Sequence, residues 1–174
     1  MATAPKGGIR GVTNMSETHA QCQEKYTNGY YSQQLEDGLV FQDIVTQALY
    51  QRGIVVVGYA SRRFQRSHGE NLLGAEIKND KKFRSTGNVY IEIAEKAHPD
   101  RPNFTASGIM RDDNSWLYVI GDEKTFWIFA TVYLKKLVSR WQRKETHTSI
   151  GHLMPVSEAD KYAIRKIEVS SDEA

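Results

Sequence analysis

A short apolar run around residue 75 carries two charged side chains two positions apart, and this pattern restricts how the segment can fold. The run closes the stretch Gly69–Lys78, and its charged residues are Glu76 and Lys78. In a β-strand the side chains at i and i+2 point to the same face, so a strand here places carboxylate and ammonium together. Glu70 precedes the run between a glycine and an asparagine, which favour a turn at the mouth of the strand.

These residue types together suit phosphodiester chemistry. Carboxylate oxygens bind hard divalent cations such as Mg²⁺, and an ammonium group stabilises an anionic transition state. The segment therefore predicts a site that hydrolyses phosphate esters. The simpler interpretation is an exposed strand on which Glu76 and Lys78 form a surface ion pair, a contact that contributes only about 0–1 kcal/mol.

The bulk composition predicts a single soluble domain. The chain has 174 residues, of which 40% are apolar and 25% are charged. We expect residues 1–15 to be disordered and residues 16–174 to form one domain. Cys22 is the single cysteine, which excludes an internal disulfide and a zinc–thiolate cluster. No secretory signal or membrane span is expected, and the predicted location is cytoplasmic.

Basic residues gather around the Glu76 stretch, although the formal net charge of the chain is only +2. Basic clusters beside carboxylates favour binding of a phosphate backbone, so we predict DNA as the partner. The alternative for each cluster is a solvated charged face. The expected DNA contacts are Arg62, Arg63, Arg66, Lys81, Lys82 and Arg84.

Hydrophobic periodicity predicts a helix first and then mainly strands. Apolar residues recur at helical spacing between Gln34 and Arg52, and Gly53 is a natural stop. The uncharged, valine-rich segment Ile54–Ala60 predicts a buried strand. The later elements expected are strands at Leu72–Lys78, Asn88–Glu95, Trp116–Ile120 and Phe126–Ala130, a charged loop at Asn79–Gly87, and helices at Val132–Arg143 and Ser157–Lys166.

This order predicts the α/β class, with a mixed central β-sheet and a helix packed on each side. Three motifs add to the order: Gly69-Glu-Asn-x-x-Gly-x-Glu-Ile-Lys78, Thr86-Gly-Asn-x-Tyr-Ile-Glu-Ile-Ala-Glu-Lys96 and Ser107-Gly-Ile-x-Arg-Asp-Asp-Asn-x-Trp-Leu-Tyr118. With them the chain resembles the PD-(D/E)XK nuclease superfamily, and more narrowly a phage and bacterial group of endonucleases within it. The resemblance implies a restriction-endonuclease-like core (helix-strand-strand-strand-helix-strand) at about Gln34–Lys96, supported by Trp116–Arg143.

The chain departs from the superfamily pattern, because it has no Pro-Asp and the acid upstream of Glu76 is only six residues away. Two assignments are open. In the first, Glu70 replaces the aspartate, and Glu76 and Lys78 form the Glu-x-Lys pair. In the second, Glu76 replaces the aspartate and Glu92 on the next strand is the second acid, with Lys78 moved to the neighbouring strand. The first assignment fits the local motif better, whereas the second fits side chains that project from one face of adjacent strands, and both need Glu76 and Lys78.

The resemblance implies Mg²⁺ as the cofactor, with Mn²⁺ as a substitute, bound by the carboxylates of either assignment. Lys78 would orient the attacking water or stabilise the transition state, and the metal would lower the pKa of that water. Glu36 matches the extra acid that many members carry on the opening helix, and Asp43 is its rival.

The expected activity is therefore a Mg²⁺-dependent DNA endonuclease of restriction or phage type. No Gly-rich phosphate loop is present, so no nucleotide cofactor is expected. Cleavage of both strands requires two sites, which predicts a homodimer. The alternatives are a catalytically inactive nucleic-acid-binding protein on the same fold and a protein-interaction module without DNA affinity. Asp112–Asn114 is interpreted as a turn, and Ser107 and Ser115 have no partner base at a telling spacing.

Overall fold

The computed structural model describes residues 30–169. The chain separates into two units, residues 1–37 and residues 38–174, which are described individually. Of the first unit only the beginning of a helix is described, so the disorder predicted for residues 1–15 lies outside the described residues. Across residues 30–169, none of the helices combines the length and the apolar character needed to cross a bilayer.

Helix α2 (Tyr30–Tyr50) confirms the helix expected at Gln34–Arg52. The segment Ile54–Ala60 that follows is not the expected buried strand. Val55 is 62% exposed, and the segment makes one isolated antiparallel bridge, from Gly58 to Asn71. The prediction was wrong because valine content alone does not supply a partner strand on each side.

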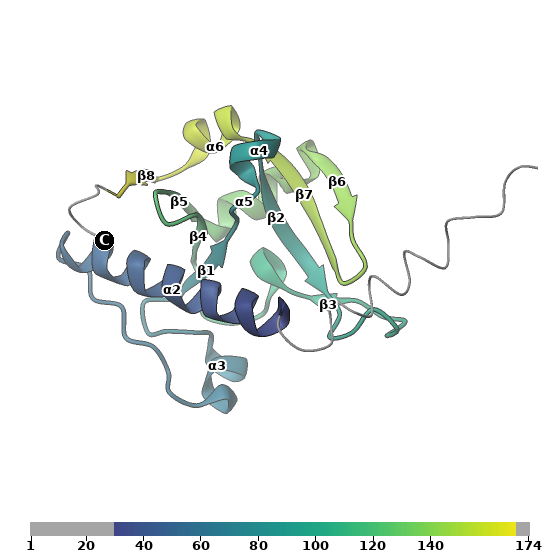
Figure 1. The fold of residues 1–174 in the computed structure, drawn as a ribbon, viewed down its shortest axis with the longest axis horizontal. Coiled ribbons are helices and arrows are strands. Elements are labelled where there is room, and N and C mark those ends of the chain that lie inside the picture. Colours follow the sequence, from purple (N-terminus) through teal and green to yellow (C-terminus); the bar gives the residue numbers. More distant parts are fainter. Residues whose placement is uncertain (1–29, 170–174) are drawn as a thin grey trace, which may run out of the picture. The chain divides into compact units, whose positions relative to one another are not determined.

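The strands form two four-stranded sheets instead of one central sheet (Figure 1). The first sheet has the order β1 (Ala75–Asn79), β4 (Leu117–Gly121), β5 (Thr125–Ala130) and β8 (Arg165–Glu168). The second has the order β3 (Thr105–Ala106), β2 (Asn88–Glu95), β7 (Ser149–Pro155) and β6 (Gln142–Glu145). β1 and β4 are parallel, and the other paired strands are antiparallel. The predicted α/β class is confirmed, whereas the prediction of a single central sheet is wrong.

Short helices and 3₁₀ turns connect the strands. They are α3 (Arg62–His68), α4 (Phe83–Thr86), η1 (Gly108–Met110), α5 (Thr131–Leu137), η2 (Val138–Arg140) and α6 (Val156–Tyr162). The charged loop expected at Asn79–Gly87 therefore contains a short helix. The helix expected at Val132–Arg143 is shorter, because the chain turns at η2 and enters β6. The helix expected at Ser157–Lys166 ends at Tyr162 and gives way to β8.

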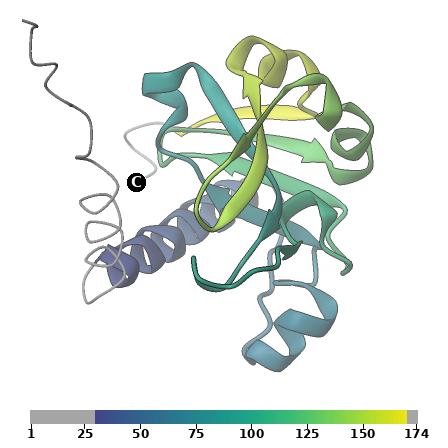
Figure 2. The same cartoon turned by 90° about the vertical axis from the view of Figure 1, so that its right-hand side faces the viewer.

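Alternation along the first sheet sends its side chains into two cores. On one face, Ala75 and Ile77 pack with α2 residues, including Phe41 and Val45. On the other face, apolar side chains of β4 and β5 pack against the second sheet, whose strands cross those of the first (Figure 2). The residues of this second core on the strands are Val89, Ile91, Tyr118, Ile120, Trp127, Phe129 and Met154.

Glu76 and Lys78 alternate with Ala75 and Ile77 along β1, so they share the face that is turned toward the second sheet. The predicted common face of this pair is confirmed. Because β1 is the edge strand of the first sheet, the pair lies at the margin of the inter-sheet core. The fold therefore brings two charged side chains to a place where the neighbouring strands carry apolar ones.

Candidate active site

Lys78 lies between two acids that come from different sheets. Its Nζ is 2.8 Å from Oε1 of Glu76 and 3.9 Å from Oε1 of Glu92. Glu76 is only 1% exposed, so the interpretation of an exposed strand with a surface ion pair is wrong. Burial disfavours the charged ammonium, but the negative charges of Glu76 and Glu92 outweigh burial and raise the pKa of Lys78 above its ordinary value.

Glu76 and Glu92 approach one another across the two sheets, not along one sheet as expected. β1 pairs with β4, whereas β2 pairs with β3 and β7. The expectation that Glu76 and Glu92 lie on adjacent strands of one sheet is therefore wrong. Glu92 and Lys78 nevertheless lie close together, with 3.9 Å between Oε1 and Nζ. These side chains are brought together by packing of the two sheets and not by pairing of neighbouring strands.

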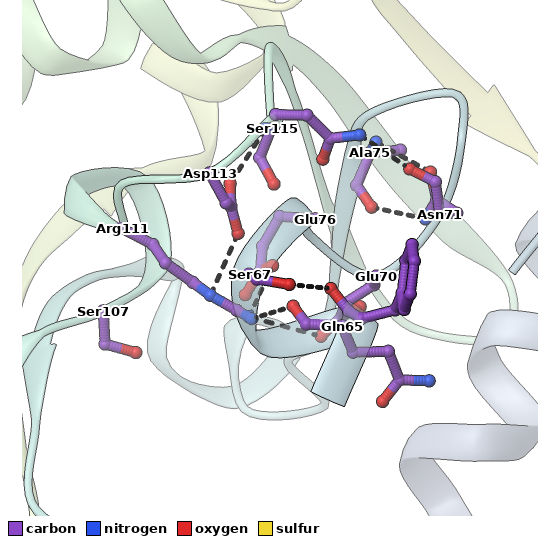
Figure 3. Close-up of polar contacts among 12 residues, drawn as sticks. Gln65, Ser67, Glu70, Asn71, Ala75, Glu76, Ser107, Arg111, Asp113 and Ser115 are labelled. Carbon is purple, nitrogen blue, oxygen red and sulfur yellow. Dashed lines mark hydrogen bonds and ion pairs between the residues drawn. The ribbon is translucent and has the colours of Figure 1, made fainter. Parts of the chain in front are cut away.

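Arg111, in the loop after η1, connects the remaining acids (Figure 3). Its Nη1 lies 3.6 Å from Oε2 of Glu76 and 4.0 Å from Oε1 of Glu70. Its Nε lies 2.9 Å from Oδ2 of Asp113, and its Nη2 donates to the carbonyl oxygen of Gln65 at 2.6 Å. One guanidinium group thus contacts β1, the turn before it and helix α3.

Glu70 belongs to a turn that is fixed by its neighbours. The buried Asn71 side chain forms two hydrogen bonds with the backbone of Ala75, as a paired strand would. Its Nδ2 donates to the Ala75 carbonyl at 2.7 Å, and its Oδ1 accepts from the Ala75 amide at 3.0 Å. Asn114 Nδ2 donates to the Asn71 carbonyl at 3.0 Å and ties the turn to the Arg111 loop. Burial, and then the charge of nearby Glu76, raise the pKa of Glu70 to about 7.

Glu92 and Tyr118 complete the cluster. Ser107 Oγ donates a hydrogen bond of 2.7 Å to Oε1 of Glu92, the oxygen that faces Lys78. The Tyr118 hydroxyl is buried and lies against the backbone of Glu92. Burial is the main cause that raises the pKa of Tyr118, and the charges of Lys78, Glu92 and Glu76 also act on it. The Tyr118 hydroxyl is therefore part of the same cluster of polar side chains as Lys78 and Glu92.

The structure thus brings together four of the five predicted catalytic residues, namely Glu70, Glu76, Lys78 and Glu92. The fifth, Glu36, is exposed on α2 within the first unit and is not placed relative to the cluster. Its rival Asp43 is exposed on the same helix.

The predicted DNA contacts divide into two groups. Arg62, Arg63 and Arg66 are exposed on α3. In the second group, Lys82 is exposed, Lys81 lies 3.3 Å from Glu123, and the Arg84 guanidinium forms a two-point contact with Asp122. The Arg84 contact fixes the α4 segment to the β4–β5 turn.

Sequence reasoning missed Arg111, Asp113, Ser107 and Tyr118 as members of the cluster. Asp112–Asn114 was interpreted as a turn, and the structure does place it in a loop, but that loop carries Arg111 and Asp113 into the site. The available signal was the motif Ser107–Tyr118, which contains all four residues. Their convergence depends on long-range packing that no local pattern encodes.

The carboxylates fit a hard cation in their chemistry. Oε2 of Glu70 and both oxygens of Glu76 are buried carboxylate oxygens, the type of ligand that hard cations prefer. Between residues 30 and 169, however, no three His, Cys, Asp or Glu side chains form a group that could hold a metal ion. Lys78 and Arg111 supply the countercharge in this arrangement. Binding of a cation to Glu70 and Glu76 therefore competes with the Arg111 guanidinium.

Comparison of the chain with protein-family models, with curated proteins and with solved structures gives no match.

Proposed function

We propose that this protein is a Mg²⁺-dependent endonuclease that hydrolyses DNA phosphodiester bonds. The observation that carries the proposal is the buried Glu76 carboxylate, 2.8 Å from Nζ of Lys78 and 3.6 Å from Nη1 of Arg111. A buried ion pair adds little stability in comparison with apolar packing, because removing charges from water is costly. Strongly perturbed acids and bases gathered in one place are more typical of a functional site.

Each residue has a distinct role in this proposal. Glu76 with Glu70 or Glu92 would hold Mg²⁺, and the ion would supply a more acidic bound water and positive charge for the phosphate. Lys78 orients that water or stabilises the negative charge of the transition state. Arg111 holds Glu70 and Glu76 near one another before the ion binds. Cleavage of both DNA strands uses two copies of the chain.

The Arg111 contacts favour one alternative, a catalytically inactive nucleic-acid-binding protein on the same fold. A guanidinium that permanently neutralises Glu70 and Glu76 would make a metal ion unnecessary. The two functions differ in their requirement for Mg²⁺ but not in their affinity for DNA.

Nicking of supercoiled plasmid DNA tests the proposal. Purified protein is incubated with plasmid in Mg²⁺, in Mn²⁺ and in EDTA, and the same assay is run on Glu76→Gln and on Glu95→Gln. Glu95 is an exposed acid of β2, so its substitution is the matched control. We expect metal-dependent nicking by the wild type and by Glu95→Gln, and none by Glu76→Gln. Absence of nicking in either metal, or full activity of Glu76→Gln, would overturn the proposal.

A further inference from the structure

Helix α3 and the segment before it display an aromatic stack on the surface. The rings of Phe64 and His68 lie parallel, with centroids 4.8 Å apart and an interplanar angle of 14°. Tyr59 lies beside both rings, at centroid distances of 5.7 Å from Phe64 and 6.2 Å from His68. Phe64 is 50% exposed, and α3 contains no buried residue. We refer to Tyr59, Phe64 and His68 as the aromatic platform.

Three arginines lie on the same short helix as Phe64 and His68, namely Arg62, Arg63 and Arg66. All three side chains are exposed, and none forms an ion pair with another residue of the described region 30–169. Elsewhere many surface cations have an acidic partner, as Arg143 has in Glu145 at 2.8 Å. A short helix that carries both exposed positive charge and exposed aromatic rings matches a ligand with phosphates and unpaired bases.

The platform is attached directly to the candidate active site. Tyr59 N donates to the carbonyl of Glu70 at 3.0 Å, and Gln65 Nε2 donates to the carbonyl of Tyr59 at 2.6 Å. The Gln65 carbonyl accepts from Arg111, whose guanidinium contacts Glu76 (Figure 3). The platform is therefore linked to the proposed catalytic carboxylates through the Glu70 backbone and Arg111.

We propose that the aromatic platform stacks unpaired bases of a single-stranded nucleic acid, while Arg62, Arg63 and Arg66 neutralise its phosphates. A base in a duplex is already stacked on its neighbours and cannot offer its face to Phe64. The platform therefore selects single strands or unpaired tails. Combined with the proposed endonuclease function, on which this last step rests, the substrate class is DNA with unpaired bases beside the bond that is cleaved.

Equilibrium binding in EDTA tests this proposal without requiring hydrolysis. The probes are fluorescein-labelled dT12, rU12 and a mixed-sequence 12-base-pair DNA duplex, measured by fluorescence anisotropy at several salt concentrations. The variants are Phe64→Ala, Phe64→Leu and Phe64→Tyr, because leucine keeps apolar area without a π-face and tyrosine keeps the π-face. Leu72→Ala is the control, since Leu72 is 64% exposed and lies outside the platform.

We expect a single strand to bind more tightly than the duplex and Phe64→Ala and Phe64→Leu to weaken that binding about tenfold. Phe64→Tyr and Leu72→Ala are expected to bind like the wild type. Replacement of all three arginines by Gln is expected to reduce the slope of log K against log salt by about 2. Tighter binding of dT12 would identify DNA as the strand, and tighter binding of rU12 would identify RNA.

Either of two results would overturn the proposal for the platform. The first is tighter binding of the duplex than of the single strands, and the second is single-strand binding that Phe64→Ala and Phe64→Leu leave unchanged. Absence of binding to all three probes would also overturn it and would point to a protein partner for this surface. The outcome is separable from the plasmid assay. Binding that depends on Phe64 in a protein that never nicks DNA would refute the endonuclease alone, and Mg²⁺-dependent nicking without single-strand preference would refute the platform alone.

Discussion

Lys78 Nζ lies 2.8 Å from Oε1 of Glu76, two residues earlier on the same strand, and Glu76 is almost completely buried. The pair combines a short distance with removal from water, so its coupling differs from that of a surface ion pair. In water-exposed pairs the attraction is screened and largely cancelled by side-chain entropy. Here the loss of one partner leaves a charge inside the protein.

Replacement of Lys78 by Met is expected to destabilise the fold by about 3 kcal/mol, because Glu76 then remains as a buried charge with Arg111 as its nearest cation. Glu76→Gln combined with Lys78→Met should recover most of that loss. Urea unfolding of the wild type, both single variants and the double variant measures the coupling energy. A coupling above about 1 kcal/mol is expected. A value near zero would show that the pair behaves like an exposed one.

Part of this pair could be predicted from the sequence, because Ala75 and Ile77 alternate with Glu76 and Lys78 and strand periodicity fixes which residues share a face. The helix around Phe41 was predictable for the same reason, since its buried side chains recur at helical spacing. Local pattern was sufficient wherever one face of an element is apolar and the other is polar.

The second sheet could not be predicted in this way. All four residues of β6, Gln142–Glu145, are exposed, so the strand shows no alternation and its sequence continues the helical pattern before it. At Ile54–Ala60 the error is the reverse, because a strand was predicted where the structure has none. The valines there have strand propensity, but the segment makes only one isolated bridge. The Arg111 contacts to Glu70 and Glu76 depend on folding of a distant loop against the turn that begins β1.

Removal of the Arg111 guanidinium should make the acid cluster dependent on a cation. Arg111→Gln leaves Glu70, Glu76 and Asp113 without the group that contacts all three, and we expect a loss of about 3 kcal/mol in EDTA. Because Mg²⁺ or Mn²⁺ can replace the lost charge, millimolar metal should raise the melting temperature of this variant by several degrees more than that of the wild type. Differential scanning fluorimetry with and without metal measures both effects. An equal metal response in the two proteins would show that the carboxylates do not attract a cation even when Arg111 is absent.

The stability of the fold should fall as pH rises from about 4.5 to about 7, owing to Glu70. Burial and the charge of Glu76 raise the pKa of Glu70 from 4.5 to about 7, so between these values the folded chain binds more protons than the unfolded chain. As the pH rises through this range the folded carboxyl loses its proton and becomes a charge in an unfavourable position, with a total loss on the order of 3 kcal/mol. Urea unfolding at several pH values, compared with Glu70→Gln, measures this contribution. The variant should lose that part of the pH dependence, and an identical profile for both proteins would contradict the assignment.

Gly108 should be required for the position of Glu92. Its φ is +51°, and a Cβ there would collide with the backbone carbonyl of Glu92, next to the Ser107 hydroxyl that donates to the Glu92 side chain. Gly87 is the matched control, because its φ is +68° but a Cβ would meet no atom within 4 Å. Gly87→Ala should therefore cost about 1 kcal/mol from backbone strain alone, and Gly108→Ala at least twice as much because backbone must also move. Urea unfolding of the two variants gives the difference. Equal losses would mean that the Ser107–Gly108 turn yields without strain, and that the hydrogen bond to Glu92 does not depend on a close approach of these two backbone segments.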